Sequence, residues 1–153
     1  MLVGGIMHNK IIIYTDGAYF DIGDIGVCSY VILDSKENII DQASFTTPKN
    51  LNSSRQIASE LLGIQNALEA CVARGFKNIE IYVDYVGLQH WFDGSWQIKS
   101  PIVGRIVGDL KNLIEKHGLS VNIRHVEAHS GDKWNNKVDR MCQIKYNEIM
   151  RRK

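Results

Sequence analysis

The sequence predicts an α/β fold in which helices flank a mixed five-stranded sheet. Five short segments are rich in β-branched and aromatic residues, and the stretches after the third, fourth and fifth have helical signals. The 153 residues are 44% hydrophobic and 23% charged, which suits one globular unit with its own core and excludes a disordered chain. We therefore expect a single domain over residues 1–153, with residues 1–9 as a short flexible N-terminus.

The expected strands span residues 11–15, 26–33, 38–45, 78–83 and 120–126. The first three follow one another closely, which favours an antiparallel meander. Helices precede the fourth and fifth strands, so these two need crossovers and parallel pairing. Ligands of such sheets bind beyond the carboxyl ends of the parallel strands, and we expect the chemistry at that edge.

The first expected helix begins at Ser53, with Gln56 three residues later as a capping-box partner, and ends near Gly75. It carries an apolar stripe that should face the sheet. The residues of this stripe are Ile57, Leu61, Ile64, Leu68 and Val72.

Three further helices complete the order β-β-β-α-β-α-α-β-α. A short helix is expected over residues 85–92, and Pro101 opens another that runs to about residue 116. Asp132 can cap a last helix from residue 133 to about 150.

Composition excludes several classes of protein. No apolar run approaches the roughly 18 residues that span a bilayer, and residues 1–8 lack a signal-peptide pattern, so we expect a cytoplasmic protein.

Cys28, Cys71 and Cys142 lie far apart in apolar surroundings, which favours reduced core thiols over disulfides or zinc. Net charge is +1, but eleven of the eighteen basic residues lie after residue 100, which permits a phosphate-binding face.

Two strands end at an aspartate. Residues 11–15 lead into Asp16, and residues 79–83 lead into Asp84. Taken singly, each aspartate is better read as the start of a turn or helix. If the two strands are parallel neighbours, however, both side chains share one edge of the sheet.

Glu60 lies within the apolar stripe of the first helix, between Ile57 and Ile64. An unpaired buried charge costs several kcal/mol, so Glu60 needs a cation, a donor or a raised pKa. The alternative is that the buried face of this helix is assigned incorrectly, or that Glu60 lies at the margin of the apolar stripe.

Asp139 borders the apolar side of the last helix, and Asn135 lies one turn earlier on the same face. Carboxylates about 4 Å apart repel by roughly 4 kcal/mol per pair at an effective dielectric near 20, so such a cluster calls for cations. Oxygen ligands favour Mg²⁺ or Mn²⁺ over zinc. Two such ions are the arrangement that serves phosphodiester displacement.

These residues resemble the motifs of type 1 ribonuclease H (the RNase HI family), from about residue 10 to 150. The matching motifs are Tyr14-Thr-Asp16-Gly-Ala18, the helix 60–70 that opens with Glu60, Val83-Asp84, and His129-Ser-Gly-Asp132 followed by Asp139. The stretches 81–91 and 128–133 are similar to bacterial members often fused to a viroplasmin-like N-terminal domain, and we expect no such domain here.

The resemblance implies a ribonuclease H-like fold and cleavage of the RNA strand of RNA/DNA hybrids, leaving 5′-phosphate and 3′-hydroxyl ends. It implies that Asp16 bridges two Mg²⁺ ions, for which Mn²⁺ can substitute. Glu60 and Asp84 would complete the coordination shell of one ion, and Asp139 would hold the other. His129 would assist proton transfer or product release. No membrane or obligatory protein partner is expected, and the protein should be a monomer.

The resemblance also suggests where the hybrid binds. RNA is distinguished by its 2′-hydroxyl, for which Gly17, Ala18 and Gln56 are candidates. Asn52, Ser54 and Arg55 could hold a DNA phosphate or simply cap a helix. The remaining candidates are Trp91 and Trp96, which could stack on the DNA, and Asn135. For Trp91 the alternative, which we favour, is packing in the core.

Some residues depart from the family pattern. Tyr85 stands where many members have Ser, and Asn135 and Asn136 stand where many have Glu. These changes bear on rate and metal preference and not on the reaction class. Two rival hypotheses stay open. One is a nuclease that prefers another duplex, and the other is a binding module of the same fold with little turnover.

Overall fold

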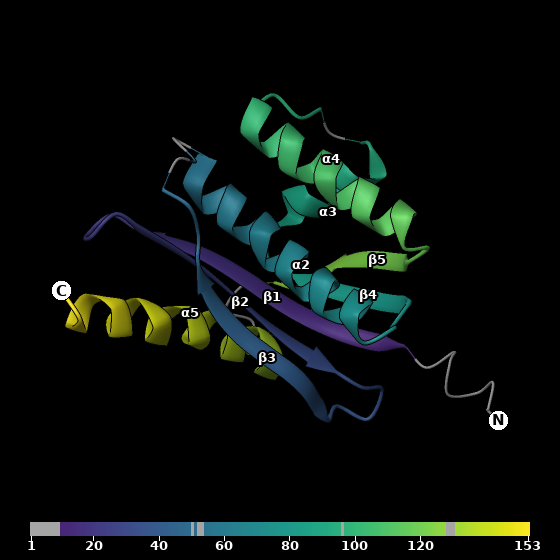
Figure 1. The fold of residues 1–153 in the computed structure, drawn as a ribbon, viewed down its shortest axis with the longest axis horizontal. Helices are drawn as coiled ribbons and strands as arrows, with labels where there is room; N and C mark the ends of the chain where they lie inside the picture. The colour runs from purple at the N-terminus through teal and green to yellow at the C-terminus, as the bar shows by residue number, and fades with distance from the viewer. Residues whose placement is uncertain (1–9, 50, 52–53, 96, 128–130) are drawn as a thin grey trace.

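The computed structural model describes residues 10–49, 51, 54–95, 97–127 and 131–153, which form one mixed sheet with helices on both faces (Figure 1). The strands are β1 (Ile11–Phe20), β2 (Ile25–Leu33), β3 (Ile39–Thr46), β4 (Asn78–Val83) and β5 (Ser120–His125). Their order across the sheet is β3-β2-β1-β4-β5. The first three strands pair antiparallel, and β4 pairs parallel with both β1 and β5. The predicted fold class and strand directions are confirmed.

The helices are α2 (Arg55–Ala73), α3 (Val86–Asp93), α4 (Pro101–Lys116) and α5 (Lys133–Arg151). Helices α2 and α4 lie on one face of the sheet, and α5 lies on the other (Figure 1). The main core forms between the sheet and α2, α3 and α4, while α5 packs on β1, β2 and β3. The predicted order of elements is therefore correct.

Strand β1 is longer than the sequence predicted. We expected it to end at Thr15, before the polar Asp16, but its pairing with β2 continues to the pair of Phe20 and Ile25. The extension exists because β2 supplies backbone partners along the whole length, which outweighs the polar character of the segment. Asp16 and Gly17 therefore lie inside a strand.

The first turn of α2 also differs from the prediction. The N-cap is Ser54, and its side chain makes no capping hydrogen bond. Ser53 lies outside the described residues. The Gln56 amide, expected in a capping box, instead makes two hydrogen bonds with the backbone of β1. That part of the capping-box prediction is wrong, because the exposed edge of β1 competes for the same side chain.

The apolar stripe of α2 is buried as predicted. Leu61, Ile64 and Leu68 are fully buried in the main core, and Ile57 packs on its margin. Burying each Leu or Ile side chain stabilises the fold by about 1.5 to 3 kcal/mol. The stripe therefore fixes which face of α2, and hence which of its polar residues, meets the sheet.

The start of α5 is confirmed. The Asp132 carboxylate accepts hydrogen bonds from the backbone N–H groups of Trp134 (3.0 Å) and Asn135 (2.9 Å). Pro101 opens α4 as predicted, with Ser100 as its N-cap. Both caps satisfy backbone donors that a helix N-terminus leaves free.

The three cysteines are free and buried, as predicted. Burial raises the pKa of the Cys28 thiol to about 11 and that of Cys71 to about 12. They are therefore inert core thiols near neutral pH. Among the described ranges, no helix combines the length and apolar character of a membrane span.

Candidate active site

The parallel pairing of β1 and β4 places Asp16 and Asp84 at the same edge. The register ends with Tyr14 opposite Tyr82, and each aspartate lies two residues beyond that pair. After this point β4 ends while β1 continues beside β2. The divergence opens the crevice in which open α/β sheets bind ligands.

Helix α2 brings Glu60 to this edge because Gly17 lets the helix approach β1 closely. A Cβ atom at Gly17 would lie 2.3 Å from the backbone nitrogen of Glu60, so no other residue type fits there. The Gly17 N–H donates to Glu60 Oε2 (3.1 Å) and to Asp16 Oδ1 (3.0 Å). One backbone donor thus fixes two carboxylates.

Asp16, Glu60 and Asp84 form one cluster. Each offers a carboxylate oxygen, and these three oxygens lie within 4.8 Å of one another. Asp16 is 4% exposed and Glu60 5% exposed. The structure therefore brings together three of the four carboxylates that the sequence singled out.

The cluster is electrostatically strained. Burial, followed by the charges of Asp84 and Asp139, raises the pKa of Asp16 from 3.8 to about 8. Burial and the charges of Asp16 and Asp84 raise the pKa of Glu60 well above its ordinary value. The Gly17 N–H partly offsets both effects. A cation at this position would relieve the strain.

The donor set fits a hard divalent cation. All three groups supply carboxylate oxygens, which are the ligands of Mg²⁺-like ions and not of soft metals. Acid side chains held this closely repel one another unless a cation lies between them. The cluster is therefore a candidate divalent metal site.

Asp139 approaches the cluster from α5. Its side chain is exposed, and its charge contributes to the raised pKa of Asp16. It is not one of the three residues whose oxygens lie within 4.8 Å. His129 lies outside the described residues.

The predicted substrate-binding residues fall into two groups. Gly17 and Ala18 lie on β1, and the Gln56 amide bonds Gly17 O (2.8 Å) and Tyr19 N (2.9 Å). Arg55 is already engaged, because its guanidinium pairs with Asp24 and donates to Tyr19 Oη (2.6 Å). Nothing in the sequence pointed to Asp24 or Tyr19 as partners of Arg55, because neither residue belongs to one of the matched motifs.

The second group lies around the starts of α2 and α4. Ser54 Oγ is 3.0 Å from Ser100 Oγ, and both line a cavity of about 300 Å³ together with Trp91 and Lys99. The Trp91 ring packs at 5.7 Å against that of Tyr85.

Three predicted substrate-binding residues remain, namely Asn135, Asn52 and Trp96. Asn135 is 4% exposed on the first turn of α5. Asn52 and Trp96 lie outside the described residues.

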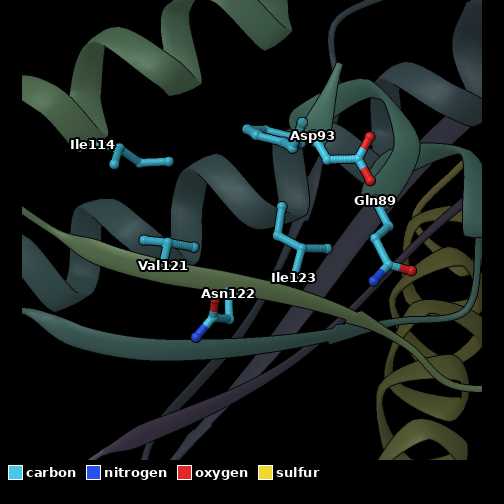
Figure 2. Close-up of a pocket in the computed structure, with 7 residues that line it drawn as sticks. Gln89, Asp93, Ile114, Val121, Asn122 and Ile123 are labelled. Carbon is cyan, nitrogen blue, oxygen red and sulfur yellow. The ribbon is translucent and has the colours of Figure 1, made fainter. Parts of the chain in front are cut away.

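A different cavity, of about 260 Å³, lies between α3, α4 and the edge strand β5 (Figure 2). Val121 and Ile123 point towards the helices, whereas Asn122 points to the other side of the strand (Figure 2). Asp93 supplies a carboxylate to its rim. This cavity belongs to the outer edge of the sheet and not to the carboxylate cluster.

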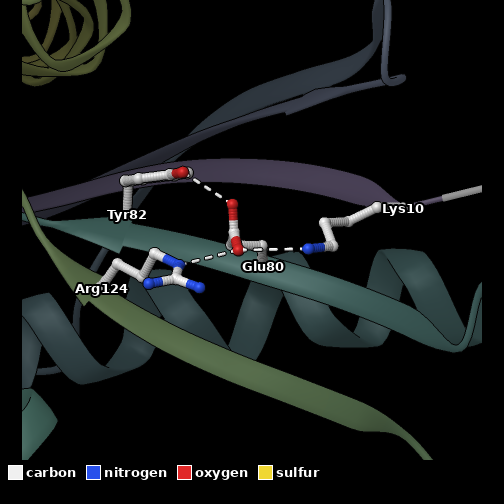
Figure 3. Close-up of polar contacts among 4 residues, drawn as sticks. All are labelled: Lys10, Glu80, Tyr82 and Arg124. Carbon is white, nitrogen blue, oxygen red and sulfur yellow. Dashed lines mark hydrogen bonds and ion pairs between the residues drawn. The ribbon is translucent and has the colours of Figure 1, made fainter.

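A second buried carboxylate, Glu80, lies on β4 and is 7% exposed. It accepts hydrogen bonds from Tyr82 Oη (2.6 Å), Arg124 Nε (2.8 Å) and Lys10 Nζ (3.4 Å), as Figure 3 shows. These partners lower the pKa of Glu80, with the Tyr82 hydrogen bond as the largest cause. The sequence analysis missed this site, since its cations come from distant segments.

Comparison with known proteins agrees with the geometry. The sequence model of the family described as RNase H matches residues 8–146. A protein named ribonuclease H from Neorickettsia sennetsu is 30% identical over 145 residues, which cover 86% of this chain and 89% of that protein. A ribonuclease H from Wolbachia pipientis wMel is 26% identical over 147 residues, which cover 88% and 93%.

A solved structure shares the fold. LC11-RNase H1, isolated from compost by a metagenomic approach, has been solved in complex with an RNA/DNA hybrid. It matches with a TM-score of 0.75 at 18% identity, and the match covers 90% of this chain and 99% of that one. The expected fold type is therefore confirmed over nearly the whole chain.

Proposed function

The chain belongs to the RNase H family, and from this premise we propose that it hydrolyses the RNA strand of RNA/DNA hybrids with divalent metal ions. The products would be 5′-phosphate and 3′-hydroxyl ends. The observation that carries the proposal is the cluster of Asp16, Glu60 and Asp84, buried at the crevice where β1 and β4 diverge. The hybrid-bound structure of LC11-RNase H1, which shares the fold, supports this choice of substrate.

The metal ions would be Mg²⁺, with Mn²⁺ as a substitute. Asp16, Glu60 and Asp84 would hold one ion, and Asp16 and Asp139 would hold a second. When bound, two such ions stabilise the attacking and the leaving oxygen of a phosphodiester displacement. The raised pKa of Asp16 supports this assignment, because carboxylates that repel one another gain most from a shared cation.

The chain's own groups orient the site. The Gly17 N–H holds Glu60 Oε2 and Asp16 Oδ1 in fixed positions, so little reorganisation is needed when a metal binds. Helix α5, which lies on the face of the sheet opposite α2, carries Asp139, which would approach Asp16 from that face. His129, on the family motif before α5, would move a proton or help to release product.

The hybrid would lie across this edge. Gly17, Ala18 and Gln56 would contact RNA 2′-hydroxyls, while Asn52, Ser54 and Arg55 would face a DNA phosphate. A phosphate at Arg55 would compete with Asp24, so this contact would be weak. The remaining proposed contacts are Trp91 and Trp96 with the DNA strand, and Asn135.

Finer features are also proposed. The motifs around residues 81–91 and 128–133 support membership of the viroplasmin-associated group. The described residues share one five-stranded sheet with hydrophobic clusters on both faces, which supports a single catalytic domain. We propose that it acts as a cytoplasmic monomer. Size-exclusion chromatography with light scattering tests the monomer, for which a mass near 17.3 kDa is expected.

The direct test is cleavage of a uniformly labelled RNA/DNA hybrid with millimolar Mg²⁺ or Mn²⁺. RNA and DNA duplexes of the same sequence serve as controls. We expect cleavage of the hybrid's RNA strand, and loss of cleavage in Asp16→Asn. Preferential cleavage of another duplex would favour a different nuclease, and binding without cleavage at every metal concentration would favour a binding module.

A further inference from the structure

Strand β1 loses its neighbour on one side just before the carboxylates. Its pairing with β4 ends at Tyr14, whereas its pairing with β2 continues to Phe20. Between these points the backbone groups on the β4 side need other partners, because an unpaired backbone group at a packed edge is costly.

Two side chains one turn apart on α2 supply these partners. Glu60 accepts from the Gly17 N–H at 3.1 Å. The Gln56 amide donates to Gly17 O at 2.8 Å and accepts from the Tyr19 N–H at 2.9 Å. Only one orientation of the carboxamide satisfies both bonds. The side chain thus supplies the hydrogen-bond partners that the backbone of an adjacent strand would otherwise supply.

The rest of this segment is held from both faces. The Arg55 guanidinium lies 4.4 Å from the centre of the Tyr19 ring. On the other face, the Phe20 ring stacks on Tyr146 at 3.9 Å, and Tyr146 Oη donates to Ile22 O at 2.7 Å. Among these contacts, those of Gln56 differ because they include Gly17, the residue whose N–H also binds the catalytic Glu60.

We propose that Gln56 is a positioning residue, which holds the carboxyl end of β1 against α2 and thereby fixes the Gly17 N–H that orients Glu60 for metal binding. This inference deepens the proposed function and rests on it for the metal. It differs from a role in direct 2′-hydroxyl contact, because it acts before any substrate binds. Each half of the carboxamide is already bonded to β1.

The test compares Gln56→Met with Gln65→Met, a control on the same helix. Gln56 is exposed, so the Met variant has a similar shape and leaves no core cavity. Two measurements need no substrate. One is amide hydrogen exchange at Tyr19 relative to Ile13, and the other is calorimetric titration with Mn²⁺.

We expect Gln56→Met to speed exchange at Tyr19 by about tenfold while Ile13 is unchanged, since one hydrogen bond is lost. We expect its Kd for Mn²⁺ to rise by about tenfold, as for other residues that orient metal ligands. In the hybrid assay, kcat at fixed metal should fall, whereas loss of the proposed 2′-hydroxyl contact alone would raise KM and leave kcat near the parent value. Gln65→Met should match the parent throughout.

Three results would overturn the inference. One is unchanged exchange at Tyr19, and another is equal acceleration at Tyr19 and Ile13, which would mean a general loss of stability. The third is an unchanged Kd for Mn²⁺ with a higher KM, which would assign Gln56 to substrate contact alone. If the parent itself bound no Mn²⁺, the proposed function would fail, whereas the exchange measurement would still test the hold on β1.

Discussion

Two buried carboxylate sites lie on neighbouring strands of one sheet and have opposite electrostatics. Glu80 on β4 is surrounded by Lys10, Arg124 and Tyr82, and its pKa is lowered. Asp16 on β1 is surrounded by other carboxyl groups, and its pKa is raised to about 8. Their exposures are similar, at 7% and 4%.

The difference shows what each site is built for. Glu80 receives its cations from the chain, so it is complete as folded and contributes to stability. The cluster at Asp16 receives carboxylates from three elements, which destabilises it until a cation from solution binds. Burial alone thus does not distinguish the two sites, whereas the charge of the neighbouring groups does.

The largest expected effect separates the two sites by activity. Asp16→Asn should lower kcat/KM on the hybrid by more than about a hundredfold, because a metal ligand is lost. Glu80→Gln should stay within about twofold of the parent, since it touches no metal or substrate. A labelled-hybrid assay measures both, and equal losses in the two variants would erase the distinction.

Metal should stabilise the protein through only one of the sites. Mg²⁺ or Mn²⁺ at about a hundred times its Kd should raise the free energy of unfolding by about 2.7 kcal/mol. Glu80→Gln should retain this gain, and Asp16→Asn should lose most of it. Thermal melts with metal and with EDTA give the comparison, and a parent melting temperature that ignores millimolar metal would contradict it.

In EDTA the two variants should change stability in opposite directions. Glu80→Gln should lose about 1 to 2 kcal/mol, because charge-assisted hydrogen bonds from Arg124 and Lys10 are weakened. Asp16→Asn should gain about 1 kcal/mol or more, because one repelling carboxylate is removed. Urea denaturation measures both, and a loss of stability in Asp16→Asn would count against a strained cluster.

The smallest expected effect is the change in stability per pH unit in the metal-free protein. The folded-state pKa of Asp16 lies above its unfolded value of 3.8, so the folded state binds more protons between about pH 4 and 8. Stability should therefore fall as pH rises through this window, by up to about 1.4 kcal/mol per pH unit for one proton. Asp16→Asn should flatten the slope between pH 6 and 8, and an unchanged slope would place the protonation elsewhere.

The comparison also shows how far the sequence alone could lead. Asp16 and Asp84 were predictable because each ends an apolar run, and parallel pairing then brings them together. Glu60 was predictable from its place in the stripe of α2. The position of Asp139 was harder to predict, because it depends on how α5 crosses the sheet.

Other features depend on register, which sequence patterns do not specify. In the alternation of β4, Glu80 looks like an ordinary outward-facing charge. Its partners lie 70 and 44 residues away, at Lys10 and Arg124, and meet it only once β1, β4 and β5 are aligned. The extension of β1 depends on how far β2 continues beside it, and the turning of Gln56 towards β1 depends on where β4 ends.

The central claim is that Asp16, Glu60 and Asp84 bind divalent metal. Anomalous diffraction from crystals soaked in Mn²⁺, collected near the manganese edge, tests it most directly. We expect a strong peak within coordinating distance of all three carboxylates in the parent, and none there in Asp16→Asn. A parent crystal with no peak at the cluster, under conditions in which Mn²⁺ is ordered elsewhere on the protein, would contradict it.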